Sequence, residues 1–146
     1  MGKKGKRTKG IEEEHPFTGM SQVNPNAEGV DIGAVEIVSC VAGENSMQIV
    51  KAFGNYTVDL QAIGRWLQEY KIKTVAMEST GVYWIPLFEV LESMGFKCLL
   101  ISSRSLRRVP GRKSDIEDAQ WIQTLHSYGL LESSFRPQAD LVALRT

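Results

Sequence analysis

The spacing of apolar and polar positions changes several times after residue 29. Positions 30–41 are rich in apolar and β-branched residues with a break at Gly33, which predicts two short strands joined by a tight turn. A turn at 43–45 leads into another apolar run at 47–53, which predicts a third strand. Because no helical pattern separates them, these three strands are expected to form a meander.

Helical and strand patterns alternate along the rest of the chain. Apolar residues recur at helical spacing over 57–70, and Pro86 and Gly95 mark the first turn and the end of a second helix. The apolar runs at 74–78 and 96–101 predict two more strands. From the third strand onward, the pattern is therefore that of strands connected by helices.

A third helix begins at a capping box formed by Ser114 and Glu117 and ends near Tyr128. The predicted order of elements is β-β-β-α-β-α-β-α. This order is typical of an α/β domain of the ribonuclease-H-like type, which is a mixed sheet, here of five strands, with helices packed on it.

The composition indicates a globular chain. Its 146 residues are 42% hydrophobic and 23% charged, enough for one domain with a core. Lys and Arg together number 17, as do Asp and Glu, so the net charge argues neither for nor against nucleic-acid binding. Two cysteines do not suggest a disulfide scaffold, and no apolar run approaches the roughly 20 residues of a membrane span. With no secretory signal, a cytoplasmic protein without membrane contact is expected.

The first 28 residues differ from the rest. They hold a basic cluster near the start and then a stretch rich in Gly, Ser, Asn and Pro, without an apolar period. This composition predicts a flexible tail. The expected organisation is therefore a tail over 1–28, a folded domain over 29–135 and the start of a connecting helix over 136–146.

Four acidic residues lie at the ends of predicted elements. Asp31 stands in the first apolar run, Glu78 ends the fourth, and Asp115 and Asp118 open the third helix. In a ribonuclease-H-like sheet the first and fourth strands are neighbours, and acids three positions apart share one face of a helix. The four carboxylates are therefore expected to converge, although each alone is also explained as a surface or helix-capping residue.

Carboxylates brought that close repel one another unless cations neutralise them. Oxygen ligands favour Mg²⁺ or Mn²⁺ over zinc. Two such ions about 4 Å apart can activate a nucleophile and stabilise the leaving oxygen in phosphodiester cleavage. The four acids together thus predict a metal-dependent site for phosphoryl transfer.

A basic stretch leads directly into the acidic helix. It covers 104–113, contains no acidic residue and has a turn at Pro110. Its cations are expected to hold phosphates beside the metal site, and the alternative is an ordinary solvated loop. These cations are Arg104, Arg107, Arg108, Arg112 and Lys113.

Other polar and aromatic candidates are weaker. His126 falls late in a helix without a second metal-type partner, which favours a structural or solvated role. Ser79 follows the acid of the fourth strand, but no His-Asp pair is placed to activate it as a nucleophile. Tyr83 and Trp84 are interpreted as packing residues, with contact to nucleic acid as the alternative.

Four strings cover most of the chain from residue 29: VDIGAVEIV, VAMESTGVYWIPLFEVLESMGFKCLLIS, VPGRKSDIEDAQWIQTLHSYGLL and SFRP. Together they closely resemble the N-terminal domain of the DEDD transposases of insertion sequences, the IS one-ten family. The most specific parts are ESTGVYW and PGRKSD followed by DAQW. The resemblance covers roughly residues 29–146.

This resemblance implies a RuvC-like variant of the ribonuclease H fold with four acids that bind Mg²⁺. The matching positions are Asp31, Glu78, Asp115 and Asp118. It also implies excision and site-specific insertion of the element, guided by a structured RNA that the element encodes. The implied partners are DNA, this guide RNA and other copies of the full-length protein.

Two departures from the family pattern bear on activity. Many relatives have a Lys three positions after the first Asp, where this chain has Ala34. Family members also carry a C-terminal domain with a serine nucleophile, and no serine here matches its motif. By itself, the chain is expected to bind metal and nucleic acid without completing recombination.

Three other functions are alternatives to this interpretation. A truncated RuvC-like module that binds RNA or DNA without catalysis would retain binding when the acids are lost. A Holliday-junction resolvase of the same fold also begins with Asp-x-Gly, but it gives no reason for ESTGVYW or PGRKSD. An actin-like ATP-binding domain needs a second Asp-x-Gly loop, which this sequence lacks.

Overall fold

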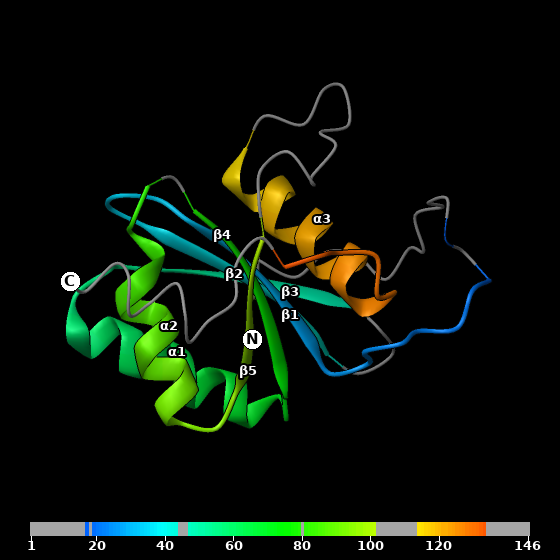
Figure 1. The fold of residues 1–146 in the computed structure, drawn as a ribbon, viewed down its shortest axis with the longest axis horizontal. Coiled ribbons are helices and arrows are strands. Elements are labelled where there is room, and N and C mark those ends of the chain that lie inside the picture. Colours follow the sequence, from blue (N-terminus) through cyan, green and yellow to red (C-terminus); the bar gives the residue numbers. More distant parts are fainter. Residues whose placement is uncertain (1–16, 18, 44–46, 80, 102–113, 134–146) are drawn as a thin grey trace, which may run out of the picture.

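A computed structural model describes residues 17, 19–43, 47–79, 81–101 and 114–133 of the chain. Within these residues, five strands form one mixed sheet, and three α-helices pack on its two faces (Figure 1). None of the described helices is long and apolar enough to cross a membrane.

The sheet joins an antiparallel meander to a parallel half. β1 (Ala27–Ile32), β2 (Ile37–Ala42) and β3 (Gln48–Phe53) pair in antiparallel fashion. β4 (Thr74–Ser79) pairs with β1, and β5 (Lys97–Ile101) pairs with β4, both in parallel. The spatial order β3-β2-β1-β4-β5 places β1 at the centre of the sheet.

The helices lie on opposite faces of the sheet. α1 (Thr57–Glu69) and α2 (Trp84–Ser93) cover one face, and α3 (Asp115–Ser127) covers the other (Figure 1). α1 leads into β4 and α2 connects β4 to β5, as parallel strands require. The α/β order β-β-β-α-β-α-β-α of a ribonuclease-H-like domain, predicted from the sequence, is confirmed.

Alternation of side chains along the strands divides the core into two layers. Val30 and Met77 are fully buried in the layer beneath α1 and α2. Ala76 faces the other way and packs against Ile122 and Leu125 of α3. Each large apolar side chain buried in this way stabilises the fold by about 1.5–3 kcal/mol. α3 therefore has an apolar face held on the sheet.

Residues that precede β1 also pack against α3. Phe17 stacks on Trp121 with ring centroids 6.0 Å apart, and the backbone N–H of Val23 donates to the carbonyl of Ser127 at 2.8 Å. β1 begins at Ala27, inside the segment 1–28 that composition predicts as a flexible tail. The described part of this segment thus contributes to the fold. Residues 1–16 and 18, and the connecting helix predicted over 136–146, lie outside the described residues.

Candidate metal centre

The central strand brings two of the four acids side by side. Asp31 of β1 is the register partner of Glu78 on the parallel strand β4. Register partners on neighbouring strands point to the same face of a sheet, here the face covered by α3. Asp31 is half-buried and Glu78 is buried. The two carboxyls thus adjoin each other at the carboxyl ends of β1 and β4.

The start of α3 supplies the other two acids. The backbone N–H of Glu117 donates to Ser114 Oγ at 3.1 Å, and the Ser114 N–H donates to Glu117 Oε1 at 3.4 Å. This is the capping box expected from the sequence, and it begins the helix at Asp115. The box uses the carboxylate of Glu117, while Asp115 and Asp118 share another face of the first turn. Acidic side chains are favoured there because the helix dipole is positive at its N-terminus.

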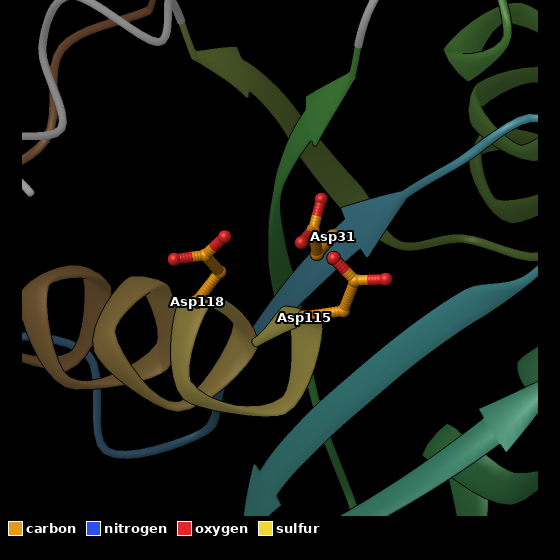
Figure 2. A group of neighbouring side chains, drawn as sticks. All are labelled: Asp31, Asp115 and Asp118. Atoms are coloured by element: carbon orange, nitrogen blue, oxygen red, sulfur yellow. The ribbon is translucent and has the colours of Figure 1, made fainter. Parts of the chain in front are cut away.

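Three carboxylates converge where β1 passes beneath the first turn of α3. One carboxylate oxygen from each of Asp31, Asp115 and Asp118 lies within 4.8 Å of the others (Figure 2). Asp115 is exposed and the other two side chains are half-buried, so this acid cluster is open to solvent on the side of Asp115. Glu78 lies outside this group of three but adjoins it through Asp31.

The acid cluster changes the protonation of its central member. The pKa of Asp31 is raised from 3.8 to about 8, first by burial and then by the charge of Glu78 and a hydrogen bond with Glu78. The charges of Asp115 and Asp118 raise it further. Asp31 therefore keeps its proton at neutral pH, because burial and its three acidic neighbours both disfavour a negative charge on this carboxyl.

This donor set fits a hard divalent cation. The cluster contributes carboxylate oxygens only. These ligands suit Mg²⁺ and Mn²⁺, whereas zinc and copper prefer nitrogen and sulfur ligands. A cation placed between the three oxygens would neutralise the negative charge of Asp31, which its proton neutralises when no cation is bound. One exposed member leaves a side of the site accessible to a substrate.

The weaker candidates differ in how deeply they are buried. Trp84 is 4% exposed and packs edge-on against Phe88 with centroids 5.5 Å apart, so it is a core residue as predicted. Tyr83 is 50% exposed, which does not support the same interpretation for it. His126 is buried, and its Nε2 lies 2.9 Å from Thr74 Oγ1, which agrees with a structural role. Burial lowers the pKa of His126 to about 4, with a smaller contribution from Lys97.

The basic residues predicted to hold phosphates fall between β5 and α3 in the sequence. Arg104, Arg107, Arg108, Arg112 and Lys113 all lie outside the described residues.

Three residues that join α3 to the sheet were not singled out from the sequence. Gly29 lies against the backbone of α3, and an isolated glycine within a strand pattern is a known sign of such close approach. Gln48 and Gln123 connect β3, α3 and β1 by hydrogen bonds. Neither glutamine carries a local signal, because its partners are distant in the sequence.

A comparison with known families gives this geometry its context. The model of the DEDD transposases of the IS110 type, described as a transposase, matches residues 28–146. A comparison with curated proteins found no match. The family match includes all four acids and nearly the whole described fold. The chain therefore belongs to the IS110 family of DEDD transposases of insertion sequences.

Proposed function

We propose that this chain is the RuvC-like catalytic domain of its transposase, spanning about residues 29–135, and that its four acids serve metal-dependent DNA strand cleavage and transfer. The observation that carries the proposal is the convergence of Asp31, Asp115 and Asp118 within 4.8 Å, beside Glu78. A DEDD family match over the same residues supports it.

Each acid has a distinct part in the proposed site. Asp31, Asp115 and Asp118 would hold Mg²⁺ or Mn²⁺ between β1 and α3, and Glu78 would complete the set beside Asp31. The bound cation supplies positive charge for activating a nucleophile and stabilising the leaving oxygen at a phosphodiester. Buried Glu78 orients Asp31 through their hydrogen bond, and exposed Asp115 lies on the side from which a nucleic acid would approach.

The proposed partners are nucleic acids and further protein. DNA is the substrate that membership of a transposase family implies. We propose further that a structured guide RNA directs the reaction and that the full-length protein acts as an oligomer. The five cations at 104–113 precede the capping residue Ser114 in the sequence and are proposed to hold phosphates next to the acids.

Metal titration tests the proposal directly. Calorimetry with Mg²⁺ and with Mn²⁺ is expected to show binding to the wild-type chain and no binding to Asp31→Ala or Asp118→Ala. Glu69→Ala is the matched control, because Glu69 is exposed in the last turn of α1, away from the acid cluster. Its metal affinity should equal that of the wild type.

Two outcomes would contradict the proposal. One is a folded wild-type chain that binds neither ion, and the other is metal binding that survives both aspartate substitutions. If RNA or DNA binding persisted in the first case, the chain would instead be a nucleic-acid-binding module without catalysis.

A further inference from the structure

α3 lies along β1 in the opposite direction, with the acids at one end of the contact. The Nε2 of Gln123 donates to the carbonyl of Ala27 at 3.3 Å. Farther along, the Nδ2 of Asn24 donates to the carbonyl of His126 at 2.9 Å. Asp31 meets the first turn of the helix at the other end. The position of α3 relative to β1 therefore decides how far its aspartates are from Asp31.

Gly29 sets the depth of this contact. A Cβ atom at this position would lie 2.6 Å from the carbonyl oxygen of Ala119 and 2.8 Å from the Cα of Gln123, and closer still to the amide nitrogen of Gln123. All of these are backbone atoms, which cannot rotate away. Ala119 directly follows Asp118, so this close approach of helix and strand adjoins the acid cluster.

Gln48 holds α3 from the outer edge of the meander. It is the first residue of the edge strand β3, and its Nε2 lies within hydrogen-bonding distance of three acceptors on α3. These are the carbonyl of Gln120 at 3.0 Å, Oε1 of Gln123 at 2.8 Å and Oγ1 of Thr124 at 3.1 Å. An amide nitrogen carries two hydrogens, so the three acceptors share two donors.

Together these contacts leave the helix little freedom. Gly29 limits its height above β1, and Gln48 limits its sideways position across the meander. Ala119 and Gln123, which are both buried, meet Gly29, and Gln123 also accepts from Gln48. A displacement of α3 would therefore carry Asp115 and Asp118 with it relative to Asp31.

We propose that Gln48 is a positioning residue which, with Gly29, holds Asp115 and Asp118 at the distance from Asp31 that selects Mg²⁺ over the larger Ca²⁺. This inference rests on the proposed function of the acid cluster. Mg²⁺ requires near-octahedral oxygen ligands at about 2.0–2.1 Å, whereas Ca²⁺ accepts about 2.3–2.6 Å in flexible geometry. A small shift of α3 penalises Mg²⁺ more than Ca²⁺, so the ratio of the two affinities reports the position of the helix.

The test compares Mg²⁺ and Ca²⁺ affinities by calorimetry in the wild type, Gln48→Ala and Gly29→Ala. Gln61→Ala is the matched control, since Gln61 is exposed on α1 on the other face of the sheet. Circular dichroism and thermal melts without metal establish that each variant is folded. Both test variants are expected to lose about tenfold in Mg²⁺ affinity, the lower end of what substitution of supporting residues costs at metal sites, and to lose less in Ca²⁺ affinity. The control should keep the wild-type ratio.

The possible results separate this inference from the proposed function. An unchanged Mg²⁺ to Ca²⁺ ratio in folded Gln48→Ala overturns the inference while leaving the metal site intact, and so does an equal loss for both ions. A wild-type chain that binds neither ion overturns the metal site and this inference with it. If Gly29→Ala does not fold, Gln48→Ala decides the matter alone.

Discussion

Asp31 of β1 and Glu78 of β4 are register partners in the parallel part of the sheet, and a side-chain hydrogen bond joins their carboxyls. Asp115 and Asp118 add negative charge from α3, and the pKa of Asp31 rises to about 8 as a result of burial and these neighbours. A charged carboxyl at this position opposes folding as long as no cation is bound. The acid cluster therefore costs stability that a metal ion would restore.

Asp31→Asn is expected to stabilise the metal-free chain. The folded-state pKa of Asp31 lies above its unfolded value of 3.8, so its favourable contribution is complete below that value and is lost as the pH rises through about 8. Near pH 8, an uncharged amide avoids both the burial of a negative charge and its repulsion by the neighbouring acids, and it should raise the free energy of unfolding by about 0.5–2 kcal/mol. Urea denaturation with a chelator measures it, and Glu69→Gln serves as the exposed control.

The same variant should lose the stabilisation that added Mg²⁺ gives the wild type, because a ligand stabilises only the state that binds it. A metal-free Asp31→Asn chain less stable than the wild type near pH 8 would show that the charge of Asp31 does not destabilise the folded chain.

Glu28 should make stability fall with rising pH. It is fully buried between Val41 of β2 and Val75 of β4, and burial raises its pKa from 4.5 to about 8. The hydroxyl of Ser39 is near enough to offset part of this rise, yet neither carboxylate oxygen makes a hydrogen bond of normal geometry among the described residues. Since the folded-state pKa is the higher one, stability is complete below 4.5 and declines toward 8, by at most about 1.4 kcal/mol per pH unit.

Glu28→Gln isolates this effect, because an amide of the same shape does not ionise. The two chains should have similar free energies of unfolding near pH 4.5, and the variant should be the more stable one near pH 8. Urea denaturation across this range measures the difference. Parallel pH profiles for the two chains would exclude Glu28 as the source of the fall in stability with rising pH.

Two buried glycines should respond oppositely to the same substitution. Gly29→Ala forces a methyl group against the backbone of α3, and such overpacking costs about 1–3 kcal/mol. Gly64→Ala in α1 meets side chains and no backbone, with the close contact made to the flexible side chain of Met94 and an ordinary one to Leu91, and it gains about 1 kcal/mol of helix propensity. Thermal melts should show a lower midpoint for the first variant and little change or a rise for the second. A stable Gly29→Ala chain would mean that α3 can move away from β1 at little cost.

Trp84 and Tyr83 are neighbours in the sequence but should differ sharply in their effect on stability. Trp84→Ala empties a site that is 4% exposed, and truncations of this kind cost about 3–5 kcal/mol. Tyr83→Ala changes a side chain that is half exposed and should stay within about 0.5 kcal/mol of the wild type. Chemical denaturation of both variants compares them, and equal losses would contradict this assignment of burial.

Much of the fold could be predicted from local signals. The capping box at Ser114 and Glu117 begins α3 where the sequence indicates, because both partners lie within one helical turn. The strands and the helices of the parallel half follow from apolar periods that depend on neighbouring residues only. The start of the first strand was predicted less accurately. β1 already begins at Ala27, because pairing with β2 and β4 compensates for a polar local composition.

Burial of individual residues was harder to predict. The sequence alone could not distinguish Tyr83 from Trp84, because adjacent positions at a helix start are buried or exposed according to what packs on them. Glu28 shows the same limit, since a glutamate in a polar segment is usually solvated and here lies inside the core.

The sequence by itself determined the type and order of the elements, the presence of four acids at their ends and the resemblance to a transposase family. These depend on residue type and short-range spacing, and they can be recognised without coordinates. Only the tertiary structure decided that three aspartate oxygens lie within 4.8 Å, that Glu78 is buried beside Asp31, and that Gly29 and Gln48 hold α3 in place. Those relations join residues far apart in the chain, and close packing between whole elements sets them.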